Sequence, residues 1–164
     1  MAHASEVQPI RLSLRPAVAD DLEFLAESHR SAQRAVESER GGRLDILLRR
    51  HGEPIEDAMS LLLGEPDLAI NVGEVDDVAV GYMVCSFETL RSGEQMCRVD
   101  DLWVHSDARG VGVGGALMRN AVEAAEAKGC TGIDARALPG DRVTKNFFES
   151  FGLVARTIEV HKAL

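Results

Sequence analysis

The chain has 164 residues, of which 45% are hydrophobic and 27% are charged, and its formal net charge is −9. This length fits a single domain with a self-sufficient core, and the acidic charge argues against a general nucleic-acid-binding surface. Apolar runs are only a few residues long, whereas a membrane-spanning helix needs roughly 20. Residues 1–9 are polar and aperiodic, so we expect a flexible tail there and one domain over residues 10–164.

The cysteines and the first residues of the chain indicate its cellular compartment. Cys85, Cys97 and Cys130 each lie in an apolar segment and show no CxxC spacing, which is typical of buried, reduced thiols. No basic and apolar leader opens the chain. We therefore expect a cytoplasmic protein that neither enters a membrane nor carries a metal.

The N-terminal part of the chain predicts one strand and then helices. Residues 11–15 alternate between polar and apolar and stop at Pro16, which indicates a short edge strand. Acidic residues followed by apolar ones at a spacing of three to four predict an amphipathic helix over residues 20–40. Two further helical pieces, over 44–52 and 54–64, follow the glycines that break this helix.

The middle of the chain predicts a meander of strands. Residues 68–72, 78–88 and 96–104 are expected to form three strands joined by short turns, which makes them antiparallel neighbours. The strand over 78–88 is apolar on both faces and is therefore expected to be central. A glycine-rich turn over 109–115 then opens a helix that ends at Gly129.

The C-terminal part predicts a parallel strand, a helix and a last strand. Residues 131–137 follow a helical crossover, so this strand is expected to run parallel to the one over 96–104. A helix over 141–151 and a strand over 153–161 complete the order. The sequence therefore predicts a mixed α/β fold, in which helices flank a central, mostly antiparallel sheet with one parallel pair.

The glycine-rich turn admits a dinucleotide interpretation, which we reject. Gly110, Gly112 and Gly115 satisfy GxGxxG, and Asp134 follows about twenty residues later on a predicted strand. However, in that fingerprint the first glycine follows its strand almost directly, whereas residues 105–109 intervene here. The roughly 50 residues that remain are also too few for the further βα units of a doubly wound fold.

The same turn resembles the acetyl-CoA signature of the GNAT superfamily of N-acetyltransferases. The resemblance rests on a strand, then Arg109-x-x-Gly112-x-Gly114, then a helix, within the segment LWVHSDARGVGVGGALM. A second segment, TKNFFESFGL, is similar to the family's "FYE…GF" region, and the resemblance covers residues 11–160. It implies the GNAT fold and transfer of an acetyl group from acetyl-CoA, the cosubstrate, directly to a primary amine.

The resemblance also implies which residues hold the cofactor. Backbone N–H groups of the glycine turn would bind the pyrophosphate, which suits a helix N-terminus. The strand before it would pair with the pantetheine arm, and its amides would polarise the thioester carbonyl. The residues concerned are Leu102, Trp103, Val104, Arg109, Gly110, Val111, Gly112, Val113, Gly114 and, in the last helix, Asn146.

Acetylation of an amine needs a group that removes a proton from the ammonium. In relatives an acidic residue on this strand often serves, commonly through water, which points to Asp101 first and to Asp100 second. Because neighbours on a strand point to opposite faces, only one of the two is expected to face the cleft. A structural hydrogen bond or a substrate clamp is the alternative role, and Glu88 and His105 are the alternative bases.

The proton donor to the leaving thiolate is not identified. Phe148 stands where many relatives have tyrosine, and the only tyrosine, Tyr82, lies on a different predicted strand. The alternative function is therefore a non-catalytic acyl-CoA-binding or regulatory module. For the enzyme, the acidic charge favours a cationic small molecule or peptide as the acceptor. The resemblance also allows a homodimer formed through the last strand or the helix faces.

Overall fold

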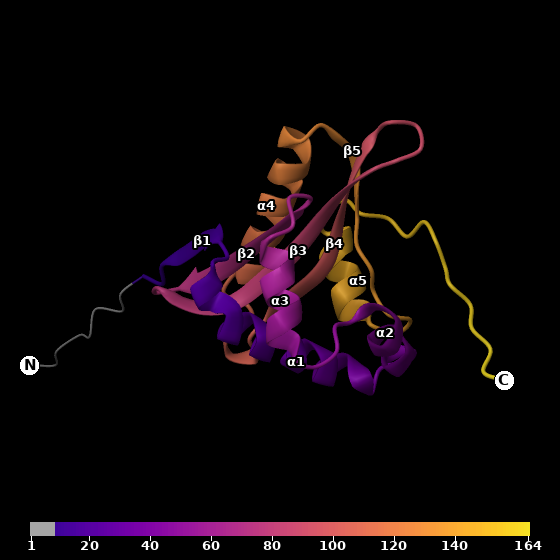
Figure 1. Cartoon of the computed structure of the whole chain (residues 1–164), viewed down its shortest axis with the longest axis horizontal. Helices are drawn as coiled ribbons and strands as arrows, with labels where there is room; N and C mark the ends of the chain where they lie inside the picture. Colours follow the sequence, from indigo (N-terminus) through magenta and orange to yellow (C-terminus); the bar gives the residue numbers. More distant parts are fainter. Residues whose placement is uncertain (1–8) are drawn as a thin grey trace, which may run out of the picture.

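The computed structural model describes residues 9–164, which are built around one five-stranded sheet (Figure 1). The strands lie side by side in chain order as β1 (Leu12–Pro16), β2 (Leu68–Val75), β3 (Val78–Thr89), β4 (Gln95–Val104) and β5 (Cys130–Asp134). Neighbours from β1 to β4 pair antiparallel, whereas β5 pairs parallel to β4. The predicted mixed α/β fold is therefore confirmed.

Helices cover both faces of this sheet. Those between β1 and β2 are α1 (Leu22–Glu37), α2 (Gly42–Arg49) and α3 (Ile55–Leu63). The connection from β4 to β5 holds α4 (Val113–Ala127), and α5 (Arg142–Glu149) follows β5. Two 3-10 turns, η1 (Ala19–Asp21) and η2 (Ser106–Ala108), precede α1 and α4. Within residues 9–164, every helix is too short or too polar to cross a membrane.

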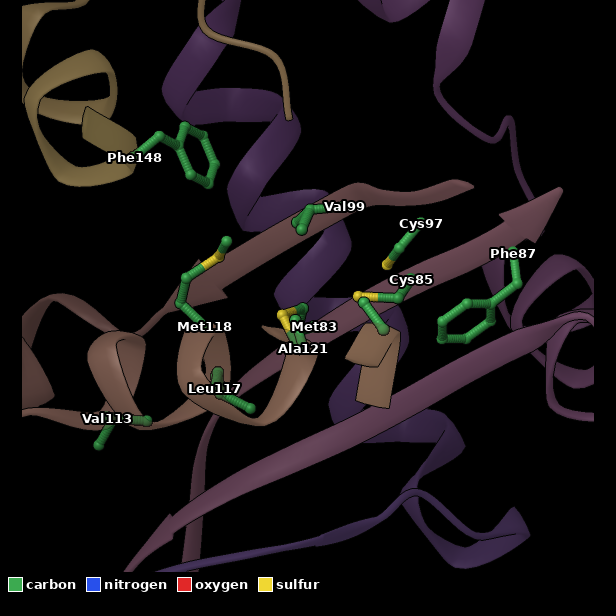
Figure 2. Close-up of a cluster of buried hydrophobic side chains, with 11 residues drawn as sticks. Met83, Cys85, Phe87, Cys97, Val99, Val113, Leu117, Met118, Ala121 and Phe148 are labelled. Atoms are coloured by element: carbon green, nitrogen blue, oxygen red, sulfur yellow. The ribbon is translucent and has the colours of Figure 1, made fainter. Parts of the chain in front are cut away.

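The sheet has a hydrophobic core on each face, because successive residues of β3 point to opposite sides. Tyr82 and Val84 pack with Leu25 of α1 on one face, while Met83 and Cys85 pack against α4 on the other. Figure 2 shows this second core, which also contains Phe87, Cys97, Val99, Val113, Leu117, Met118, Ala121 and Phe148. The prediction that β3 is a central, doubly buried strand is confirmed.

Two glycines let the start of α4 approach the sheet closely. Gly73 of β2 pairs with Gly81 of β3, and both face Val113, the first residue of α4. A Cβ atom on Gly73 would lie 2.6 Å from Cγ1 of Val113, and one on Gly81 would lie 3.3 Å from it. The two missing side chains therefore fix the position of the α4 N-terminus above the sheet.

The predicted last strand is wrong. Residues 153–161 form no strand in the structure and run away from α5 along the outside of the molecule (Figure 1). A strand needs a hydrogen-bonding partner and a face to bury, but Val154, Ile158 and Val160 are 81%, 86% and 92% exposed. Ion pairs from Arg156 to Asp134 and from Arg49 to Glu159 hold the segment instead. The predicted tail over residues 1–9 lies outside the described residues, apart from Pro9.

Candidate active site

Strands β4 and β5 pair over only part of their length. The register joins Gln95–Arg98 of β4 to Cys130–Asp134 of β5, and beyond Arg98 only β3 pairs with β4. Residues 99–104 therefore keep one edge without a strand partner among residues 9–164. An open edge of this kind offers backbone N–H and C=O groups to an extended ligand.

A cavity of about 1090 Å³ lies along this open edge of β4. Its walls come from residues 99–104 of β4, from the glycine turn with the start of α4, from α1 and α2, and from α5. Cavities that bind drug-sized ligands commonly measure roughly 300–1000 Å³. The space therefore accommodates a large cofactor together with part of a second molecule.

The glycine turn provides unpaired backbone donors at one end of the cavity. Gly110 and Gly112 have φ angles of +83° and +97°, which glycine adopts without strain. The first hydrogen bond of α4 joins the N–H of Ala116 to the carbonyl of Gly112, and no side chain caps the helix. The N–H groups of Val113, Gly114 and Gly115 thus have no helical partner and suit an anion.

Most of the residues expected to hold the cofactor line this cavity. They are Leu102, Trp103, Val104, Arg109, Gly110, Gly112, Val113 and Gly114. Val111 and Asn146 are exposed and do not line it, so their roles stay predictions. Arg136, Thr144 and Phe147 line it without having been predicted.

Both Asp100 and Asp101 line the cavity, so the expectation that only one of them would do so is wrong. Across the β3–β4 pair, Val84 lies opposite Asp101 but the next residue, Cys85, lies opposite Val99. Asp100 is therefore an additional residue in β4, a β-bulge that interrupts the alternation of side chains. The bulge sends Asp101 to the face of Tyr82 while Asp100 stays at the rim, paired with Arg98.

Asp101 is the centre of a buried polar cluster. Its carboxylate accepts hydrogen bonds from Nδ1 of His29 at 2.9 Å, from Nη1 of Arg50 at 3.0 Å and from the hydroxyl of Tyr82. Burial alone would raise the pKa of Asp101, but the hydrogen bonds and the charge of Arg50 outweigh it and lower this pKa. Burial and the Asp101 carboxylate raise the pKa of Tyr82 well above its ordinary value.

Two histidines complete the cluster, and sequence reasoning missed both. The rings of His29 in α1 and His51 after α2 have centroids 5.5 Å apart, and both rings line the cavity. Burial, followed by the charge of His29, lowers the pKa of His51. One signal was available, because His29 follows Leu25 and Ala26 at the spacing of the buried face of α1.

The alternative bases lie elsewhere. Glu88 pairs with Arg98 on the sheet surface, and His105 packs edge-on against Trp103 with centroids 5.7 Å apart. Neither lines the cavity.

Phe148 lines the cavity from α5 and is 8% exposed, whereas Tyr82 is fully buried with its hydroxyl on Asp101. Among residues 9–164, no group of three or more histidine, cysteine, aspartate and glutamate side chains is arranged to hold a metal ion.

Comparisons with solved structures support the fold. A transcriptional regulator from Bacillus halodurans C-125 superposes with a TM-score of 0.71 at 21% identity, over 94% of this chain and 100% of that one. An aminoglycoside acetyltransferase from an uncultured soil metagenomic sample, in complex with sisomicin, gives 0.71 at 17% identity, over 93% and 95%. Ribosomal-protein-alanine N-acetyltransferase from Brucella melitensis biovar Abortus 2308 gives 0.69 at 17% identity, over 95% and 99%.

Sequence comparison identifies the family. No curated protein matches the chain. The sequence model described as "Acetyltransferase (GNAT) family", however, matches residues 26–153, which include the open strand, the glycine turn and α5. The chain therefore belongs to the GNAT family of acetyltransferases.

Proposed function

We propose that the protein transfers an acetyl group from acetyl-CoA directly to a primary amine. The observation that carries this proposal is the junction of two features in one cavity. Unpaired N–H groups at the start of α4 suit a pyrophosphate, and the free edge of residues 99–104 suits an extended pantetheine arm. Acetyl-CoA would supply the acetyl group as a thioester, which an amine attacks more readily than it attacks an ester or an amide.

Individual residues have separate tasks in this proposal. The backbone of residues 109–114 holds the phosphates, and the guanidinium of Arg109, whose Nε donates to the carbonyl of Val104 at 3.2 Å, adds positive charge. The backbone of Leu102, Trp103 and Val104 lies along the pantetheine and donates to the thioester oxygen. Asn146, in the middle of α5, is exposed and does not line the cavity, and its proposed task is to touch the pantetheine or the thiol side.

Direct transfer, without an acyl-enzyme, is supported by the cavity wall. No cysteine or serine of residues 9–164 lines the cavity, and the hydroxyl of Thr144, which does, makes no hydrogen bond to a described base that could activate it for a covalent step. Cys85 and Cys97 are buried in the core beneath α4 (Figure 2). All three cysteines are free, which also supports our proposal of a cytoplasmic location.

We propose a cationic amine as the acceptor. Of the two acetyltransferases compared above, one is an aminoglycoside acetyltransferase in complex with sisomicin and the other is a ribosomal-protein-alanine N-acetyltransferase. In this chain the net charge is −9, and Glu39 lines the cavity without an ion pair to any described residue. A carboxylate at this position would attract a cationic acceptor to the side of the cavity formed by α1 and α2.

We also propose a homodimer. The outer edge of β5 has no strand partner within the described chain, and residues 153–161 carry exposed apolar side chains next to it. Pairing of this segment with a second copy would give the edge of β5 a strand partner and would bury the exposed apolar side chains. Light scattering of the purified protein tests the proposal, since a mass of one chain would contradict it.

The experiment that tests the function has two steps. Calorimetry with acetyl-CoA measures cofactor binding, and no heat at high micromolar ligand would contradict the proposed cofactor. Release of CoA thiol is then followed with a panel of amines, polyamines, aminoglycosides and peptides. Turnover with at least one amine is expected. Tight binding of acetyl-CoA without turnover on any acceptor would favour the alternative, a non-catalytic acyl-CoA-binding or regulatory module.

A further inference from the structure

His29 has one ring nitrogen fixed and the other free. The side chain is 4% exposed, and Nδ1 lies 2.9 Å from the Asp101 carboxylate. A carboxylate only accepts hydrogen bonds, so Nδ1 donates its proton to Asp101 and Nε2 is the ring nitrogen that this contact leaves unused. Nε2 is buried and has no hydrogen-bond partner among residues 9–164. A buried polar atom without a partner is uncommon in proteins and calls for a functional reason.

His51 packs against the ring of His29, and both residues line the cavity. The two rings are in contact, and His51 is more exposed than His29. Nε2 of Gln33 donates to the backbone carbonyl of His51 at 2.7 Å and so fixes the segment that carries this ring. The lowered pKa of His51 keeps its imidazole neutral at physiological pH, with a lone pair available.

We propose that His29 and His51 together accept the proton of the acceptor ammonium, and that Asp101 is the positioning residue that holds His29. This inference rests on the proposed acetylation of an amine. Asp101 is itself poorly suited to take the proton from the amine, because His29, Arg50 and Tyr82 already occupy its carboxylate oxygens. The histidine pair offers what Asp101 lacks, namely unoccupied nitrogen lone pairs beside the cavity.

The proposed reaction moves one proton from the ammonium to the histidine pair and one electron pair from the C–S bond to sulfur. An N–H bond of the ammonium breaks, its electron pair stays on nitrogen, and the proton binds His51. His51 passes a proton to Nε2 of His29 through one water, because no described protein group lies within hydrogen-bond distance of Nε2, and the resulting imidazolium lies against the Asp101 carboxylate. The neutral amine then attacks the thioester carbon, and the C–S bond breaks with its electrons on sulfur. The amine's second proton neutralises the thiolate, and the histidine pair releases its proton to solvent.

Several charged groups face the two histidines. Asp101 of β4 and Glu53, which precedes α3, place negative charge near His29, and Asp101 and Asp100 place it near His51. Arg50 lies beside both His51 and Asp101 and opposes protonation of His51. Tyr82 of β3 contributes a neutral hydroxyl, 3.2 Å from Nδ1 of His29.

The test uses the pH dependence of turnover in three variants. His29→Asn keeps a donor near the position of Nδ1 but removes Nε2, and His51→Asn removes the outer imidazole. His161→Asn changes an exposed histidine of the C-terminal segment and is the matched control. We measure kcat and KM between pH 5 and 10 with the best amine of the panel, and acetyl-CoA affinity by calorimetry.

Loss of a general base typically costs about 10²–10⁴ in rate. At pH 7 we expect both active-site variants to lose at least roughly 100-fold in kcat while acetyl-CoA affinity changes less than about twofold. Their rates should recover towards pH 10, because the acceptor amine then loses its proton to solvent. A merely structural histidine would not give this alkaline recovery. His161→Asn should retain the wild-type profile.

The outcomes separate the two proposals. Wild-type protein that releases no thiol with any amine would contradict both the function and the histidine pair. Turnover whose acidic limb is unchanged in His29→Asn and His51→Asn would overturn the histidine pair alone. If His29→Asn does not fold, His51→Asn decides, since its more exposed ring contributes less to the core.

Discussion

Arg50 donates a hydrogen bond of 3.0 Å to Asp101, and the two side chains are only 16% and 10% exposed. The contact ties the segment after α2 to the bulged part of β4, across the cavity wall. Because both charges are largely removed from water, each depends on the other for compensation. The same carboxylate holds His29, so one residue connects the stability of the site to its proposed chemistry.

Asp101→Asn should therefore destabilise the protein in a pH-dependent way. At pH 7 we expect a loss of about 3–5 kcal/mol in the free energy of unfolding, because Arg50 loses its counter-charge. The folded pKa of Asp101 lies below its ordinary value of 3.8, so its stabilising effect is complete above that value and fades as the pH falls through the folded pKa. Urea unfolding at pH 7, 5, 4 and 3 should show the difference between wild type and variant shrinking below about pH 4.

The exposed Asp67 provides the control for that series. It makes no side-chain hydrogen bond or ion pair with a described residue, so Asp67→Asn should change stability by less than about 0.5 kcal/mol at every pH. A penalty for Asp101→Asn that stays constant down to pH 3 would contradict the argument from protonation and point to altered packing.

Gly73→Ala should push α4 away from the sheet. The new Cβ atom would lie 2.6 Å from Cγ1 of Val113, and overpacking of this kind typically costs about 1–3 kcal/mol. Thermal and urea unfolding measure the loss. Gly52→Ala is the control, because nothing lies within 4 Å of a Cβ atom at that position.

A double-mutant cycle identifies the cause of this loss. Removing Cγ1 with Val113→Ala should make Gly73→Ala less costly than it is in the wild-type background, with a coupling of roughly 0.5–3 kcal/mol. Additive effects of the two substitutions would show that the Gly73 side of the sheet does not position Val113.

The sequence predicts the parts of the fold that local patterns determine. The strand over 78–88, which is apolar on both faces, the helix after the glycine turn and the crossover to β5 all follow from local patterns and turn residues, and all are confirmed. The prediction of a last strand is wrong because the residue pattern of 153–161 specifies only an extended backbone conformation. Whether such a segment pairs depends on a free edge and on a surface to cover, which are tertiary properties.

The site was predictable on the cofactor side and much less so on the acceptor side. The glycine turn is a contiguous motif, so its place at the end of the cavity follows from the residues themselves. The polar cluster brings together His29, Arg50, Tyr82 and Asp101 from four separate segments. The bulge at Asp100, which directs Asp101 into this cluster, arises from the pairing with β3 and has no local sequence signal.

Gly112→Asp should weaken acetyl-CoA binding. The residue precedes α4 at φ +97°, so a side chain there is strained, and a carboxylate would repel a phosphate at the helix N-terminus. We expect an affinity loss of at least roughly tenfold, which corresponds to about 1.4 kcal/mol, measured by calorimetry. Gly93→Asp, at φ +90° in the β3–β4 turn, introduces the same strain and charge at a residue that does not line the cavity. Equal losses in the two variants would place the phosphate elsewhere.

Phe148→Tyr should accelerate turnover if departure of the thiolate limits the rate. Phe148 lines the cavity and is 8% exposed, so a hydroxyl added to its ring would place a proton donor in the cavity wall. We expect kcat to rise by about tenfold above pH 8, where free protons are scarce, which is less than the roughly 10²–10⁴-fold that a fully positioned general acid contributes. Phe147→Tyr is the matched control, since its ring packs against Phe148 at 5.4 Å and also lines the cavity. A rate increase confined to Phe148→Tyr would show that the wild-type protein lacks an efficient acid at this position. Unchanged kcat in both variants, with acetyl-CoA affinity preserved, would instead show that the thiolate departs without help from α5.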